Sequence, residues 1–495
     1  MTGASHKTVL VSISQLINYG LPLITFLLLV RTFDTTLYGV WIETMTIVGL
    51  LTTFGIHGLG NAVGAMILSR NGQEEAIYSN ALYVFLMLAG ALTLMMGLTA
   101  PGLNAITARH PLGSPVIQIA SLQVLINALN WLASQVFRLR QQPVRGVAFD
   151  IALSLVRLGA VAFAFFQRDL LLFALVHVLS QMTVTIVQVA ASYWGIALQR
   201  PSWPLVRELG HYAVNLSVVS QANWVVMYGD RLLLSLFAAS AAVAIYSASY
   251  QLSLILVALG WPSLYFLLPA LGERWRAGNT VGAQAVVRQA TRAILIIVTP
   301  AVVGLALTGE ALLRLLGNED FARGSVLVGL IALGVALDVV GTAAQYIFYV
   351  RGEPQTLRRI YIWAAVFNVA VNLIAIPLFG YYGAGVTTLL TFLLIAILLW
   401  RQVKMPLNSL IDLSVLGRCV LASMVMGVYV ALVVNTTVPG LIIAIAGGMV
   451  IYGLGLLALR IVSIGEMLEL VRAPFRWGTP PVVEAAQDES REGPP

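Results

Sequence analysis

The chain consists of long apolar segments separated by short polar connections. Fourteen of these segments are long enough for a helix to cross a lipid bilayer. They lie near residues 9–30, 39–68, 79–100, 115–137, 147–167, 170–197, 211–237, 241–270, 286–308, 325–350, 359–378, 382–402, 412–434 and 440–461. Lipid cannot satisfy exposed backbone groups, so spanning segments of this length form helices. The pattern predicts an all-α polytopic membrane protein with about 14 transmembrane helices.

Composition supports this class, and charge suggests an orientation. Hydrophobic residues make up 59% of the 495 residues and charged residues 10%, whereas soluble proteins have about 25% charged residues. The net charge of +7 does not indicate nucleic-acid binding, because the basic residues gather in alternate connections. With the N-terminus in the cytoplasm, 21 of the 28 Lys and Arg residues face that compartment. This asymmetry predicts that both termini are cytoplasmic.

Five basic residues fall on the opposite, external side in this topology. They are Arg31, Arg109, Arg168, Arg314 and Arg323. The first apolar segment follows a basic residue, as a signal peptide would, but it lacks a small-x-small cleavage site, so we expect it to remain as a helix. The single cysteine, Cys419, excludes a disulfide framework.

The segment from Trp363 to Thr391 contains two of the apolar segments, joined by the short turn Gly380-Tyr381-Tyr382-Gly383. A turn of this length predicts an antiparallel helical hairpin. Asn368 and Asn372 are four residues apart and therefore share one helix face. Since unpaired amides are costly in hydrocarbon, we expect this face to point into the protein.

Two patterns recur along the chain at similar offsets. FRLRQQP at 137–143 matches FYVRGEP at 348–354, and FDTTLYGVW at 33–41 resembles FAASAAVAIY at 237–246. Arg-x-x-Pro is also common at helix ends in membrane proteins, which is the alternative explanation. A true repeat of six helices would give two halves inserted in the same direction. The predicted division is an N-lobe (1–205), a C-lobe (206–405), helices 13 and 14 (406–462), an interfacial helix (463–477) and a disordered tail (478–495).

Several motifs resemble one known family. They are Asn-x3-Asn, Ile376-Pro377, the Gly-x-x-Gly turn and a Thr pair in the hairpin, YGVW at 38–41, and Gly229-Asp230-Arg231 followed by AIYSAS at 244–249. These motifs resemble the Wzx-type polysaccharide and O-antigen flippases of the MOP superfamily, which also contains MATE exporters and the lipid II flippase. The resemblance covers about residues 8–400 in scattered pieces. It implies two lobes around a central cavity and transport by alternating access.

The resemblance also implies a site for Na⁺ or a proton. Positions matching the ion site of the related lipid II flippase are Asp230, Asn368, Asn372 and Thr388. Asn372 stands where that pattern has an acid, which weakens attraction for a hard cation, although amide oxygens suit one. The alternative is that the amides only bond neighbouring helices. Because Asp230 and Arg231 are adjacent and project about 100° apart on a helix, we predict that they do not pair with each other.

Other polar residues inside apolar segments are candidates for the substrate cavity. Arg157 either forms a salt bridge within the N-lobe or binds substrate pyrophosphate, since a guanidinium binds oxyanions with two parallel hydrogen bonds. The remaining cavity candidates are Arg231, Gln15, Asn18, Glu43, His57 and Asn61. His177 is predicted to be structural.

The resemblance implies a flippase for undecaprenyl-pyrophosphate-linked oligosaccharides in the bacterial inner membrane, with membrane lipids, a polysaccharide polymerase and assembly proteins as partners. No catalytic motif or phosphate-binding loop is present, so we expect no enzyme activity, no cofactor and no nucleic-acid partner, with energy supplied by an ion or substrate gradient. The alternatives are a MATE-like exporter of small molecules, a membrane-embedded glycosyltransferase, polymerase or ligase, and a scaffold for envelope assembly. An exporter of cations would call for acidic cavity residues, and a glycan enzyme for a large external loop.

Overall fold

The computed structural model describes residues 21–70, 72–265 and 267–462. Gln15, Asn18, the predicted interfacial helix and the predicted tail lie outside these ranges. The described residues contain no strand, and eleven of their helices are long and apolar enough to cross a membrane. The all-α polytopic membrane class is therefore confirmed. The count of fourteen spans stays a prediction; one of the eleven helices, Pro354–Val403, contains two predicted spans.

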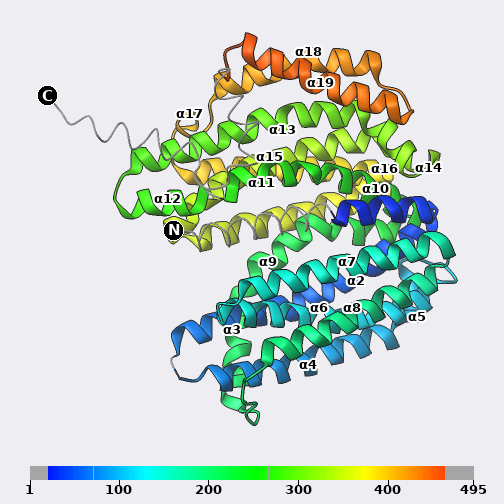
Figure 1. The fold of residues 1–495 in the computed structure, drawn as a ribbon, viewed down its shortest axis with the longest axis vertical. Helices are drawn as coiled ribbons and strands as arrows, with labels where there is room; N and C mark the ends of the chain where they lie inside the picture. Colours follow the sequence, from blue (N-terminus) through cyan, green and yellow to red (C-terminus); the bar gives the residue numbers. More distant parts are fainter. Residues whose placement is uncertain (1–20, 71, 266, 463–495) are drawn as a thin grey trace.

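The N-terminal helices pack side by side in the lower part of Figure 1. Their bounds are Leu21–Thr32, α2 Thr35–Thr52, the π-helical turn η1 Thr53–His57, α3 Gly58–Ser69, α4 Glu74–Leu98, α5 Ala100–Ile106, α6 Gly113–Leu139, α7 Pro143–Gln167 and α8 Leu170–Tyr193. We call α2 to α8 the lower bundle.

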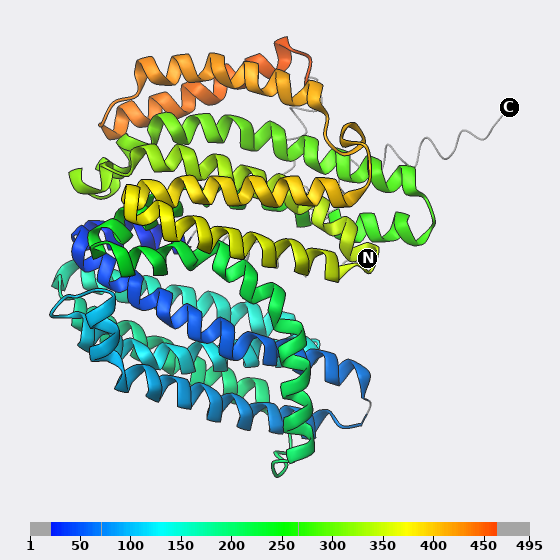
Figure 2. The same ribbon diagram turned by 180° about the vertical axis from the view of Figure 1, so that it is seen from behind.

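The C-terminal helices form a second group above them, and Figure 2 shows the same division from behind. Their bounds are α10 Ser240–Ser253, α11 Ile255–Tyr265, α12 Leu267–Arg276, α13 Thr280–Leu316, α14 Glu319–Ala322, α15 Ser325–Val350, α16 Pro354–Val403, α17 Leu407–Leu410, α18 Leu413–Val433 and α19 Val438–Ala458. We call α10 to α16 the upper bundle. Helices α18 and α19 lie along its outer edge, where α18 packs on α13.

One long helix, α9 (Trp203–Phe237), runs from the lower bundle to the upper one. Its first half packs against α3: a Cβ built on Gly58 would lie 2.6 Å from the carbonyl oxygen of Ala213. Helix α9 also packs closely on α16. The lobe boundaries at 205 and 405 stay predictions.

Short polar side chains fix where several helices begin. Asp34, Asp169, Asn279 and Asp412 each accept a hydrogen bond from a backbone N–H in the first turn of α2, α8, α13 and α18 respectively. The first turn of a helix leaves its N–H groups without intrahelical partners, and such a cap satisfies one or two of them. The polar connections in the sequence therefore set the ends of the spans.

The two longest predicted segments, 39–68 and 241–270, are irregular. The segment from Thr35 to Ser69 contains the π-helical turn η1, and a Cβ on Gly60 would overlap the indole nitrogen of Trp131. The segment near 241–270 divides into α10, α11 and α12. Its first break follows Ser253.

Helix α16 is the predicted hairpin. Its backbone leaves helical geometry at Gly380, where φ is 58° and ψ is −138°, a conformation almost restricted to glycine. The two legs lie antiparallel, and the side chain of Asn368 donates a 3.2 Å hydrogen bond to Thr391 Oγ1 on the other leg. The hairpin and the inward orientation of Asn368 and Asn372, both fully buried, are confirmed.

Candidate functional site

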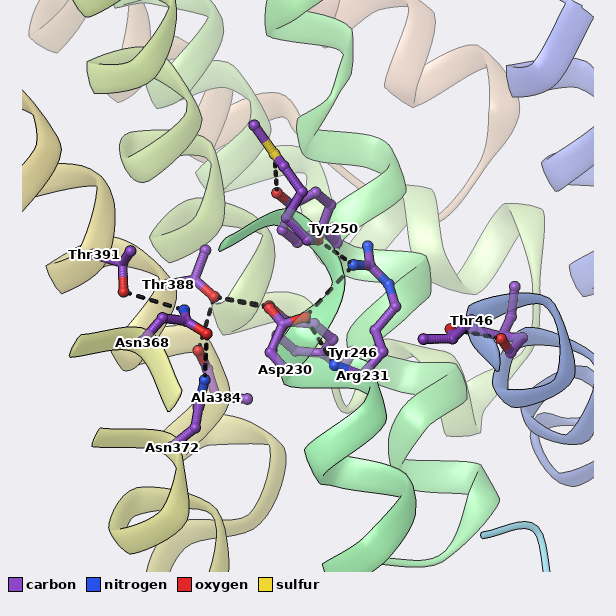
Figure 3. A network of polar contacts seen from close by, with 12 residues as sticks. Thr46, Asp230, Arg231, Tyr246, Tyr250, Asn368, Asn372, Ala384, Thr388 and Thr391 are labelled. Carbon is purple, nitrogen blue, oxygen red and sulfur yellow. Dashed lines mark hydrogen bonds and ion pairs between the residues drawn. The ribbon is translucent and has the colours of Figure 1, made fainter. Parts of the chain in front are cut away.

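The centre of the site is the carboxylate of Asp230, which is fully buried on α9. Its Oδ2 accepts hydrogen bonds from Tyr246 on α10 and, at 3.2 Å, from Thr388 on the second leg of α16. The hydroxyls of Tyr246 and Thr388 are also within 2.8 Å of each other. Figure 3 shows the three side chains converging from their three helices. A buried carboxylate of this kind is stable only when its oxygens are paired.

The prediction that Asp230 and Arg231 do not pair is wrong. Arg231 Nη1 lies 3.6 Å from Asp230 Oδ1. The prediction considered only the directions in which the two side chains leave the helix, but a long side chain folds back over the preceding turn. Here Arg231 Nη1 also donates a 2.6 Å hydrogen bond to the carbonyl of Met227, which brings the guanidinium to the Asp230 side.

Three tyrosine rings surround the guanidinium of Arg231. Its Cζ lies 4.3 Å from the ring centroid of Tyr250, 5.0 Å from Tyr228 and 5.7 Å from Tyr246. Cations at these distances are attracted to aromatic faces. The Asp230–Arg231 pair is therefore held from both sides: the carboxylate by hydroxyl groups and the guanidinium by aromatic rings.

The two hairpin amides lie beside this network on α16. Asn372 Nδ2 donates to Asn368 Oδ1 at 3.2 Å. Asn372 Oδ1 is buried and has no hydrogen-bond partner among the described residues. Together with Asp230 and Thr388, the amides offer carboxylate, hydroxyl and amide oxygens, the ligand types that hard cations prefer. The four residues predicted for the cation site thus lie in or beside one buried network.

Arg157 belongs to a second network, inside the lower bundle. Its Nε donates a 2.7 Å hydrogen bond to Gln181 Oε1 on α8. Gln123 on α6 donates to the same Gln181 oxygen at 3.3 Å and to Asn127 at 2.9 Å. Within the described ranges Arg157 forms no ion pair, so the salt bridge that was one of its two predicted roles is not seen there.

The other cavity candidates lie apart from both networks. Glu43 is 2% exposed and contacts Ser240 at the start of α10. His57 is half-buried, with its ring 4.9 Å from that of Trp131, and Asn61 is half-buried on α3. His177 packs against Trp41 and Phe173, with ring distances of 5.1 and 5.3 Å, in agreement with its predicted structural role.

Sequence reasoning missed five residues of these networks. They are Tyr246, Tyr250, Thr391, Gln123 and Gln181. The signal that identified the two asparagines, a spacing of four between polar groups in an apolar segment, also occurs between Tyr246 and Tyr250 and between Gln123 and Asn127. The same criterion applied to the whole chain would have found these pairs.

Comparison with known proteins places the chain in a family. A family model described as polysaccharide biosynthesis protein matches residues 5–275. The relative named "probable low-salt glycan biosynthesis flippase Agl15", from Haloferax volcanii, is 20% identical to this chain. The alignment covers 90% of this chain and 94% of the relative. An uncharacterized membrane protein of Methanocaldococcus jannaschii, MJ1068, is 23% identical, and the alignment covers only 54% of each chain.

Solved structures share the fold. The lipid II flippase MurJ in an inward closed conformation superposes with a TM-score of 0.75 at 13% identity, covering 90% of this chain and 98% of MurJ. An inward-facing MATE multidrug resistance transporter of the MOP superfamily gives 0.66 at 15% identity, covering 80% and 95%. The chain belongs to the polysaccharide biosynthesis protein family and has the fold of the MOP superfamily transporters, as its motifs predicted.

Proposed function

We propose that this protein is a flippase that moves undecaprenyl-pyrophosphate-linked oligosaccharide from the cytoplasmic to the outer leaflet of the bacterial inner membrane. A sugar headgroup carrying a diphosphate cannot cross hydrocarbon unaided. Two helix bundles that move against each other would expose a polar path to one side at a time, while the lipid tail stays in the bilayer. Family membership and the glycan flippase named among the relatives support this substrate class.

The main support for the proposal is the hydrogen bonding of the Arg157 guanidinium. Only its Nε is bonded, to Gln181, and its two terminal nitrogens have no hydrogen-bond partner among the described residues. The guanidinium is thus fixed in orientation with its two outer donors available. A diphosphate oxyanion is the ligand that this geometry suits, because both can bond in parallel.

Energy for transport would come from Na⁺ or protons binding in the Asp230 network. The unpartnered oxygen of Asn372 supports this, because a buried amide oxygen without a donor is a position that a cation can occupy. A cation bound between α9 and α16 would stabilise the conformation in which these helices are packed as they are here.

Replacing Arg157 with Ala is expected to reduce surface polysaccharide at least about tenfold in a flippase-null strain, because a charge-assisted hydrogen bond contributes about 1.5–3 kcal/mol. The protein should still accumulate, since Gln181 Oε1 keeps its bond from Gln123. Immunoblots of membrane fractions and of the polysaccharide measure the two quantities. Arg145→Ala, a change at an exposed arginine that bonds Gln142, is the matched control.

Normal polysaccharide in the Arg157→Ala strain would remove Arg157 from the substrate path. Failure of the wild-type protein to support export of any lipid-linked glycan, together with cation-dependent efflux of small dyes, would favour the exporter alternative, which the shared MATE fold keeps open.

A further inference from the structure

The starts of α2 and α10 lie in unusually close contact. A Cβ built on Gly39 would overlap the carbonyl oxygen of Ser240 and lie 2.5 Å from its carbonyl carbon. Glycine at position 39 therefore allows the two backbones to touch. One helical turn further along α2, Glu43 Oε2 accepts a 3.0 Å hydrogen bond from Ser240 Oγ. The carbonyl of Ala108, before α6, lies 3.2 Å from the same hydroxyl. We call these four residues the α2–α10 contact.

Two arginines bond the C-terminal ends of other helices at the same end of the protein. Arg109, next to Ala108, donates a 2.8 Å hydrogen bond to the carbonyl of Leu236 in the last turn of α9. Arg31 donates one of 2.8 Å to the carbonyl of Leu315 in the last turn of α13. Both satisfy carbonyls that a helix leaves unpaired at its C-terminus. Both also belong to the five arginines predicted to be external, so the closed end is the predicted external end.

If Glu43 is ionised, the α2–α10 contact has more hydrogen-bond acceptors than hydrogens to bond them. Ser240 Oγ has one hydrogen, yet two acceptors, Glu43 Oε2 and Ala108 O, lie within bonding distance. Glu43 Oε1 is buried and has no partner among the described residues. If Glu43 is protonated, its carboxyl donates to Ser240 Oγ and Ser240 donates to Ala108 O. Each hydrogen in this chain of bonds then has one acceptor, and the buried Oε1 carries no charge.

The guanidinium of Arg109 attracts a charge on Glu43 from a distance but forms no ion pair with it. Besides Glu43, the charged and titratable side chains on α2, α6, α9, α10 and the connection before α6 are Tyr38, Arg109, His110, Arg138, Arg207, Glu208, His211, Tyr212, Tyr228, Asp230, Arg231, Tyr246 and Tyr250. Asp230 and Arg231 pair with each other, Tyr246 bonds Asp230, and Arg109 bonds Leu236. Among the described residues, no ion pair of 4 Å or less involves Glu43.

We propose that Glu43 is a proton-binding site that couples the opening of the external end to the external pH. Glu43 holds a proton while α2 and α10 are in contact. When that end opens, water reaches the carboxyl, which releases its proton to the external compartment and ionises. Closing requires a proton to return. This site is separate from the Asp230 network, and it rests on the proposed function only in assuming that the two bundles move apart during transport.

Electron paramagnetic resonance distances across the external end test this directly. Spin labels on cysteines replacing Ile106 and Glu319, both exposed, report the separation of the bundles in a Cys419→Ser background. One proton bound only in the closed state changes the ratio of open to closed molecules by up to about tenfold per pH unit. From pH 5 to pH 9 we therefore expect a longer distance to grow at the expense of the short one.

Two variants distinguish the effect of protonating Glu43 from the effect of the backbone contact between α2 and α10. Glu43→Gln, which remains neutral and can donate to Ser240, should keep the short distance at every pH. Gly39→Ala, which forces the backbones apart, should give the long distance at every pH. Glu310→Gln neutralises an exposed carboxylate on α13 and should respond to pH as the wild type does.

A wild-type distance that does not change with pH, or a Glu43→Gln protein with the full wild-type response, would overturn the proposal. The measurement needs no substrate. A normal pH response in a protein that fails to export glycan would therefore count against the flippase function and leave the proton site standing.

Discussion

Replacing Asp230 with Ala is expected to destabilise the protein by about 3–5 kcal/mol and to abolish transport, because removing one partner of a buried ion pair leaves the other charge uncompensated. The Arg231 side chain is 7% exposed and would keep only the Met227 carbonyl and the tyrosine rings as partners. Tyr246 and Thr388 would also lose their shared acceptor. Thermal unfolding of the purified protein in detergent measures the loss.

The Asp230→Asn variant removes the negative charge of the side chain while nearly keeping its shape. An amide oxygen can still accept from Tyr246 and Thr388, so the fold should be disturbed less than in Asp230→Ala. A neutral amide attracts a cation far less. Ligands that bind only the folded state raise its unfolding temperature. We expect Na⁺ to stabilise the wild type but not Asp230→Asn. Lower pH should stabilise the wild type more than Asp230→Asn, in which only Glu43 of the two proposed proton sites remains.

Glu353→Gln provides the control, because Glu353 is an exposed carboxylate outside the Asp230 network. It should respond to Na⁺ and pH as the wild type does. An Asp230→Asn protein that retains the same cation-dependent stabilisation and the same transport would eliminate the ion site. The network would then be a structural element that holds α9, α10 and α16 together.

Local patterns in the sequence were sufficient for the parts of the fold that depend on nearby residues. The turn at Gly380 and the inward face of Asn368 and Asn372 each follow from spacing or from the chemistry of a few consecutive residues. The length of the apolar segments is also a local property of the sequence, and it predicted the membrane class.

Contacts between distant segments were not predictable in this way. Glu43 and Ser240 are 197 residues apart, and no local pattern indicates that their helices start side by side. The pairing of Asp230 with Arg231 depends on a side-chain conformation that the surrounding tyrosines favour. Both features require knowledge of which helices pack together. Gly39 is a further example: the sequence identified it only as part of a family motif, whereas its physical role is to let the backbone of Ser240 approach α2.

Replacing Gly383 with Val is expected to cost about 3 kcal/mol, at the upper end of the usual range for overpacked sites. A Cβ at this position would overlap the carbonyl oxygen of Ala375 and lie 2.6 Å from its carbonyl carbon. Both atoms belong to the backbone of the first hairpin leg, so no rotamer change can relieve the overlap. The legs must separate, and the 3.2 Å bond between Asn368 and Thr391 should be lost.

The hairpin substitution therefore links packing to the proposed ion site. If the amides contribute to cation binding, Gly383→Val should lose stabilisation by Na⁺ or protons as well as unfolding temperature. Gly417→Val is the matched control, because Gly417 is exposed on α18 and a Cβ there meets nothing within 4 Å. Equal unfolding temperatures for the two variants would show that the legs are not held by this contact. A Gly383→Val protein that is destabilised but keeps the full cation response would instead place the ion site at Asp230, Tyr246 and Thr388, with the amides serving only to join the two legs.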